Sequence, residues 1–108
     1  MRPTLLQLID ATVKEAFVSS ECVVTARVFA DRFTEVIGEI PDFKVKANSH
    51  GIYIFLDGDN GVLEVIARSD HLFSVVWRRH DLTYMEEINH ATVEQAVTFA
   101  FRHLAPCA

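Results

Sequence analysis

The densest group of side chains that could do chemistry is the run from Trp77 to Asp81, which reads Trp-Arg-Arg-His-Asp. Arginine binds phosphates and carboxylates, and an imidazole held by a carboxylate can act as a general base. Neighbouring residues on a strand point to opposite faces, so the adjacency of His80 and Asp81 argues against a catalytic pair. The same holds for Asp70 and His71. We expect Trp77 to be a core residue and the two arginines to lie at the exposed end of a strand.

The histidines and cysteines also lack the spacing of a reactive site. Histidines stand at positions 50, 71, 80, 90 and 103 without HxH, HExxH or Cys–His spacing, so no zinc site is indicated. The chain has no GxSxG elbow, P-loop or GxGxxG motif. We assign no catalytic, cofactor-binding or metal-binding residue and expect no cofactor, which disfavours an enzyme. Cys22 and Cys107 are expected to be free thiols in a reducing cytoplasm, with an intermolecular bridge through Cys107 as the alternative.

The segment from Asp57 to Gly61 resembles a calcium-binding loop superficially, because it combines acidic residues with glycine. An EF-hand loop needs a longer series of oxygen ligands, a glycine at its sixth position and a closing glutamate, with a helix on each side. Here the series is short and the flanking runs are strand-like. Gly, Asn and Asp tolerate positive φ, so we predict a hairpin turn.

Length and charge restrict the class of protein. The chain of 108 residues is expected to form one domain over residues 1–108, and 50% of its residues are hydrophobic. Ten basic against fifteen acidic residues give a net charge of -5, which excludes the global basic footprint of a nucleic-acid-binding protein. The acidic balance favours attraction to a basic partner. No stretch approaches the roughly 20 apolar residues of a membrane span, so we predict a cytoplasmic protein without membrane contact.

Hydrophobic periodicity predicts two helices in the first part of the chain. The first spans about residues 4–17. The second spans about residues 21–39, or 25–39 if Val23 and Val24 form a short strand instead. Pro41 prevents the second helix from continuing.

The middle of the chain predicts an antiparallel sheet. Four short apolar runs follow one another, at residues 43–47, 52–56, 62–68 and 71–79. Their connections are too short for parallel crossovers, so neighbouring strands must pair antiparallel. A fifth strand is considered at about residues 82–85, and Thr92 with Gln95 matches the capping box of a last helix. The predicted fold is α+β, with two N-terminal helices, a four- to five-stranded antiparallel meander sheet and a C-terminal helix packed on one sheet face.

Strand alternation predicts two different sheet faces. The first is apolar and suits the helices; it carries Phe43, Val45, Ile52, Ile54, Leu56, Leu63, Val65, Phe73, Val75 and Trp77. The second is too apolar in its centre for an ordinary solvated face, and contiguous apolar patches usually mark interfaces. We predict an interface on or beside this face formed by Tyr53, Phe55, Ile66, Leu72, Val76, Arg78 and Arg79. The five uncharged members should be partly exposed in an isolated monomer, unless a helix or the curl of the sheet covers them.

One core is predicted between the sheet and the helices. Its members should include Phe29, Phe33, Val36, Phe73, Val75, Val97 and Phe101.

The functional hypotheses follow from the second sheet face and the charge. Small acidic α+β proteins recur among toxin-neutralising immunity proteins and secretion chaperones, and this chain is similar to them in size, charge and layout. The first hypothesis is a non-enzymatic binding protein, such as an acidic immunity- or antitoxin-like inhibitor acting through a sheet face on a protein partner. One alternative is a domain that binds a small apolar ligand in a pocket between sheet and helices. A secretion-chaperone-like homodimer is the other. The proposed pocket would be lined by Phe29, Phe33, Tyr53, Phe55 and Trp77.

Overall fold

The computed structural model describes residues 3–38 and 42–104, which form three helices and one five-stranded sheet. In chain order the elements are α1 (Leu5–Val13), α2 (Ser20–Ile37), β1 (Asp42–Asn48), β2 (Gly51–Asp57), β3 (Gly61–Ala67), β4 (Phe73–Arg79), β5 (Met85–Ala91) and α3 (Val93–Leu104). The strands lie in the sheet in the same order as in the chain, and every neighbouring pair is antiparallel. The α+β meander predicted from the sequence is therefore confirmed, with five strands.

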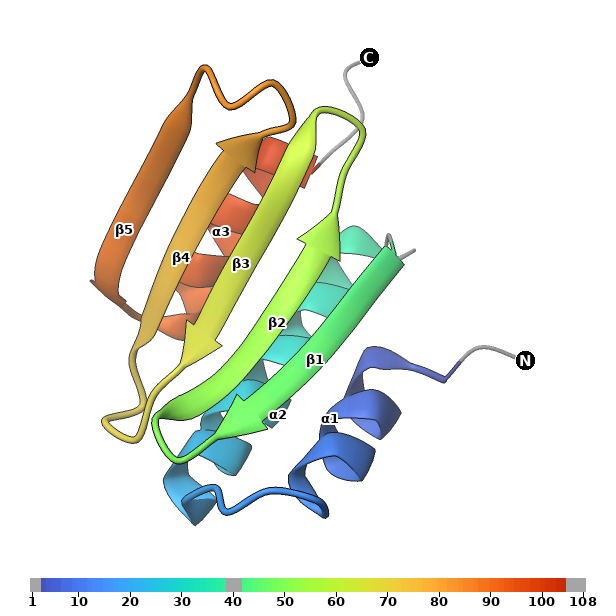
Figure 1. The fold of residues 1–108 in the computed structure, drawn as a ribbon, viewed down its shortest axis with the longest axis vertical. Helices are drawn as coiled ribbons and strands as arrows, with labels where there is room; N and C mark the ends of the chain where they lie inside the picture. Colours follow the sequence, from blue (N-terminus) through green and yellow to red (C-terminus); the bar gives the residue numbers. More distant parts are fainter. Residues whose placement is uncertain (1–2, 39–41, 105–108) are drawn as a thin grey trace.

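α2 and α3 lie on one side of the sheet (Figure 1). α2 packs against β2 and β3, while α3 packs against β3, β4 and β5 and contacts α2. α1 lies beside the β1 edge and also contacts α2. Within the described ranges, no helix covers the other face of the sheet (Figure 1).

Two of the helix predictions need correction at their ends. α1 begins with a capping box between Thr4 and Gln7, as its first turn requires, but it ends at Val13 and not at Phe17. A tight turn follows, because the N–H groups of the next residues bond carbonyls only three positions back, and Phe17 is 96% exposed. α2 contains residues 23 and 24, so the alternative of a short strand there is wrong. It ends at Ile37, before a glycine with φ of 78°, and Glu39 lies outside the described residues.

The fifth strand lies later in the chain than predicted. Residues 80–84 connect β4 to β5, and there Asp81 accepts hydrogen bonds from the backbone and hydroxyl of Thr83 at 3.0 and 2.6 Å. Leu82 takes a φ of 61°, which is incompatible with a strand. β5 then pairs with β4, and a bulge near His90 adds one residue to β5.

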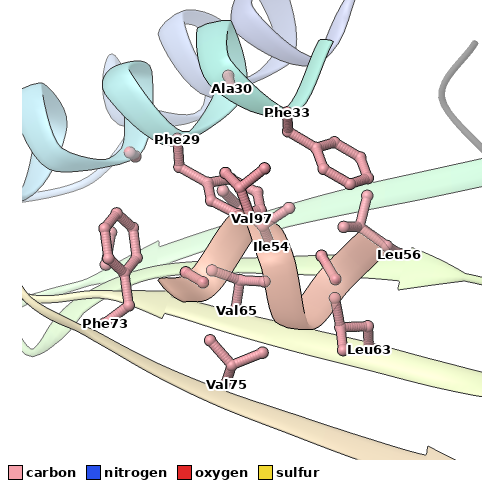
Figure 2. Close-up of a cluster of buried hydrophobic side chains, with 14 of the residues drawn as sticks. Phe29, Ala30, Phe33, Ile54, Leu56, Leu63, Val65, Phe73, Val75 and Val97 are labelled. Atoms are coloured by element: carbon pink, nitrogen blue, oxygen red, sulfur yellow. The ribbon is translucent and has the colours of Figure 1, made fainter. Parts of the chain in front are cut away.

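The core lies between the helices and the helix-facing side of the sheet, and Figure 2 shows its centre. Phe29 and Phe33 of α2 stack with their ring centroids 5.4 Å apart, and Phe29 also meets Phe73 of β4 at 5.7 Å. The strand pairing confirms the predicted helix-facing set, because its members face one another across neighbouring strands. Val97 of α3 completes the cluster from the other helix (Figure 2).

Two residues predicted in this core are on the surface. Val36 is 43% exposed and Phe101 is 45% exposed. In α2 the buried stripe runs through Phe33 to the half-buried Ile37, so Val36 is rotated out by one position. In α3 the residue before Phe101, Ala100, faces the core in the same way.

Candidate functional site

The interface predicted from the sequence lies on the side of the sheet that no helix covers in the described ranges. We call this side the open face and define it by the side chains that alternate with the helix-facing ones. Its members are Asp42, Lys44, Lys46, Tyr53, Phe55, Asp57, Val62, Glu64, Ile66, Ser74, Val76, Arg78, Met85 and Glu87. Figure 1 is viewed onto this side, with α2 and α3 behind the sheet.

The strand register orders the open face into three rows that cross the sheet. The middle row runs from β1 to β5 through Lys44, Phe55, Glu64, Val76 and Glu87. The row toward the β2–β3 turn runs in the same direction through Asp42, Asp57, Val62, Arg78 and Met85. The third runs through Lys46, Tyr53, Ile66 and Ser74, and the β5 bulge follows. Apolar side chains therefore surround Glu64 on the three inner strands, which also carry Asp57 and Arg78, and the other four charged side chains lie on the two edge strands.

Most of the central apolar side chains are only half-buried. Tyr53, Phe55 and Ile66 have intermediate exposure in the single chain, and so does Leu72 just outside β4. Val76 departs from the expectation of partial exposure, since it is only 7% exposed. It lies between Glu64 and Glu87 in its row, and these longer side chains flank it on both neighbouring strands.

Polar contacts fix several side chains on this surface. Arg78 approaches Glu64 across the β3–β4 pair, with 3.5 Å between Nη1 and Oε2. Arg68, just beyond β3, donates from Nε to the hydroxyl of the buried Ser74 at 3.0 Å. The ammonium group of Lys46 lies 5.8 Å from the ring centre of Phe55. Such contacts order the charged groups around the apolar centre.

Two predicted interface residues lie beside the open face and not on it. Arg79 follows Arg78 on β4, so strand alternation turns it toward the helix side, where it lies 3.7 Å from Asp81. Leu72 precedes β4 in the β3–β4 connection, and its carbonyl accepts from the backbone N–H of Arg68. The structure therefore brings Tyr53, Phe55, Ile66, Val76 and Arg78 onto one face and leaves the other two at its margin.

A groove of about 830 Å³ opens where α1 meets the β1 side of this surface. Pro3 and Leu8 line it from the α1 region, and Lys44, Phe55 and Val62 line it from the open face. The five side chains expected to line a pocket between sheet and helices do not lie on one side of the sheet. Phe29 and Phe33 are fully buried in the core, whereas the register places Tyr53 and Phe55 on the opposite side of the sheet from Trp77.

The β2–β3 loop forms the predicted turn, closed by a hydrogen bond from the Gly58 N–H to the Gly61 carbonyl at 2.9 Å. His80 packs against this turn, with Nε2 3.1 Å from the Gly58 carbonyl and 3.8 Å from Asp57. His71 instead contacts the hydroxyl of Thr25 at 3.2 Å. Among residues 3–38 and 42–104, no three His, Cys, Asp or Glu side chains are grouped to hold a metal ion.

His103, which the sequence analysis did not single out, lies on the helix side between α3 and the β4–β5 pair. The His103 ring stacks on Trp77 at 5.1 Å and meets Phe99 at 4.5 Å. Its Nε2 is 3.1 Å from a Glu86 oxygen but not aligned for a hydrogen bond, so this buried nitrogen has no hydrogen-bond partner in the described part of the chain. Burial lowers the pKa of His103, and the Glu86 carboxylate offsets this only in part. Packing against the two aromatic rings therefore favours the neutral imidazole.

No family model, curated protein or solved structure matches this chain. Cys22 is a buried free thiol of α2, and Cys107 lies outside the described residues. Within the described ranges, no helix has both the length and the hydropathy to cross a bilayer.

Proposed function

We propose that this chain is a non-enzymatic binding protein whose open face packs against another protein surface. The observation that supports it is the group of half-buried Tyr53, Phe55 and Ile66 at the centre of a sheet face without a helix over it in the described ranges. Moving this apolar area out of water would contribute roughly 25 cal/mol for each Å² buried. An apolar centre with a charged margin is also the usual composition of a protein interface.

An immunity- or antitoxin-like inhibitor is one form of this function, since such a protein needs a docking surface and no catalytic group. The groove beside α1 supports the alternative of a small apolar ligand, because its volume of about 830 Å³ lies within the range of ligand pockets. Phe55 lines the groove and also belongs to the open face. A ligand there would therefore occupy the margin of the same surface.

The test is to replace Phe55 and Ile66 together by glutamate. Both side chains lie on the side of the sheet away from the core, so the variant should keep its helical circular dichroism and its cooperative unfolding. It should lose any stoichiometric association, whether with itself or with another protein, in sedimentation velocity. The matched control is Val36→Glu with Phe101→Glu, because these side chains are 43% and 45% exposed on the helix layer. The control should associate like the wild type.

Three results would contradict the proposal. The first is a wild-type protein that stays monomeric and loses no protein partner when Phe55 and Ile66 are changed. The second is a double variant that fails to fold together with a single Phe55→Lys variant that also unfolds, because the face would then belong to the core. The third is recovery of a monomer with a bound small molecule that disappears in the Leu8→Glu variant, which would favour the ligand in the groove.

A further inference from the structure

We propose that the open face binds the open face of a second copy of this chain, with the two-fold axis parallel to the strands and passing over β3. The inference rests on the proposed function and names the partner. It follows from the order of charged and apolar side chains within the three rows of the face.

A two-fold axis in this direction places β1 of one copy over β5 of the other and β2 over β4, while β3 lies over itself. Each row then faces the same row of the second copy, read in the opposite direction. In the middle row, Lys44 at the β1 end therefore faces Glu87 of the second copy. Phe55 faces Val76 in the same row, which joins two apolar side chains.

The two outer rows add one further opposite-charge pairing and two apolar contacts at the axis. In the row toward the β2–β3 turn, Asp57 faces Arg78 of the second copy, and Val62 faces its own equivalent. In the third row Ile66 meets Ile66 at the axis. By symmetry each opposite-charge pair occurs twice, and the apolar side chains meet near the axis.

One like-charge contact remains, between the two copies of Glu64 at the axis. Within each chain the guanidinium of Arg78 lies 3.5 Å from the Glu64 carboxylate. Its positive charge weakens the repulsion between the two Glu64 carboxylates. The Glu64 side chain is only 17% exposed, whereas that of Arg78 is 53% exposed. Arg78 can therefore reach both its own Glu64 and Asp57 of the other copy.

A two-fold axis across the strands gives more like-charge contacts. A two-fold axis across the strands, centred on the middle row, places every strand over itself. Lys44 would then face Lys44, and Glu87 would face Glu87. Glu64 would also face Glu64, and only Asp42 would face an opposite charge, on Lys46. Like charges that face one another across an interface oppose association, so the charge pattern favours the axis parallel to the strands.

Size and twist are compatible with this dimer. Five strands about 4.8 Å apart and about 20 Å long give roughly 500 Å² of projected face per copy, and roughly 1,000 Å² for the pair. That is at the lower end for specific interfaces, so we expect a reversible dimer. Aligned sheets cross at about 30°, which displaces the edge strands, about 10 Å from the axis, by about 5 Å along their length. A lysine side chain can span that displacement.

The experiment is a charge exchange between the two edge strands. Lys44→Glu and Glu87→Lys each turn both copies of one attractive pair into a repulsive one, and each should raise the dimer dissociation constant about tenfold or more. Mixing the two variants should restore the affinity to within about threefold of the wild type. In the mixed dimer the introduced glutamate faces the introduced lysine, and the unchanged Lys44 faces the unchanged Glu87. Both substituted positions are exposed, so folding should be unaffected.

Lys14→Glu and Glu15→Lys are the controls, because they change the net charge equally at exposed positions beside α1. They should leave the dissociation constant unchanged in sedimentation equilibrium. A wild-type protein that is monomeric at about 100 µM would overturn the second copy as partner, and the proposed binding function would then depend on the Phe55 and Ile66 test alone. A dimer whose dissociation constant is unchanged by Lys44→Glu and Glu87→Lys, but which is lost when Phe55 and Ile66 are changed, would overturn the β1-over-β5 arrangement. A dimer that survives every variant would overturn both proposals.

Discussion

Replacing Phe29 should destabilise the core far more than replacing Phe101. Phe29 is 0% exposed, stacks on Phe33 and meets Phe73, so its ring is enclosed by α2 and β4. Replacement of a fully buried phenylalanine by alanine costs about 3–5 kcal/mol, and we expect Phe29→Ala in the upper half of that range because its neighbours are rings on two regular elements. Phe101 is 45% exposed, so its burial contributes about half of the roughly 1.5–3 kcal/mol of a buried side chain. Phe101→Ala should therefore cost about 1 kcal/mol.

Urea unfolding followed by tryptophan fluorescence measures both variants. Trp77 is the single tryptophan, is 5% exposed and stacks on His103, so its emission will change when the core opens. The slope of the unfolding free energy against urea should be the same in all three proteins, since the variants bury nearly the same total surface. A loss below about 1.5 kcal/mol for Phe29→Ala, or equal losses for both variants, would refute the assignment of Phe29 to the centre and Phe101 to the surface.

Two further predictions concern His103 and Gly61, which lie against the C-terminal end of β4. Burial lowers the pKa of His103 below its ordinary 6.5, so the unfolded chain binds more protons than the folded chain as the pH falls below about 7, and stability should decrease in that direction. His103→Phe should flatten the dependence between pH 7 and 5 in urea unfolding, and an unchanged dependence would contradict the effect. Gly61→Ala should cost about 1–3 kcal/mol, because a Cβ at this position would overlap the Arg78 carbonyl and the Trp77 ring. A loss below about 0.5 kcal/mol would show that the β3–β4 pair adjusts freely.

The first four strands could be predicted because each has its own local signal. Residues 52–56 and 62–68 are apolar runs separated by a loop rich in Gly, Asp and Asn, and the short loop alone imposes antiparallel pairing. β5 has no such signal. It reads Met-Glu-Glu-Ile-Asn-His-Ala, lies at the sheet edge, and its bulge interrupts the alternation of apolar residues. An edge strand that buries few side chains carries little hydrophobic pattern from which to predict it.

The helix ends and the core list failed for a different reason. The stripe from Leu5 through Val13 continues in the sequence to Phe17, but the chain turns after α1 toward α2. Periodicity describes which residues share a helix face and does not say where a helix leaves the sheet. Phe99, which is 3% exposed against His103, was missed because it lies beside the main stripe of α3.

For the candidate site, the alternation of side chains could be predicted but the strand register could not. Alternation alone assigned Tyr53, Phe55 and Ile66 to a common face, since β2 and β3 are joined by a short turn. It could not predict which side chains lie side by side across the sheet, because a shift by one pair in any hairpin would rearrange the rows. Val76 was expected to be partly exposed for this reason, but it is only 7% exposed between its row neighbours Glu64 and Glu87.

The charge of the whole chain is a poor guide to the partner of the open face. The net charge of -5 suggested a basic partner, yet the face carries three basic side chains against four acidic ones. Most of the acidic excess therefore lies elsewhere and acts on this surface only through weak, screened, long-range forces. The positions of the charged side chains within the rows matter more than the net charge of the face, because Lys44 and Glu87 occupy opposite ends of one row. A nearly neutral face with basic and acidic groups at opposite ends is complementary to itself, whereas a uniformly acidic face would repel a second copy.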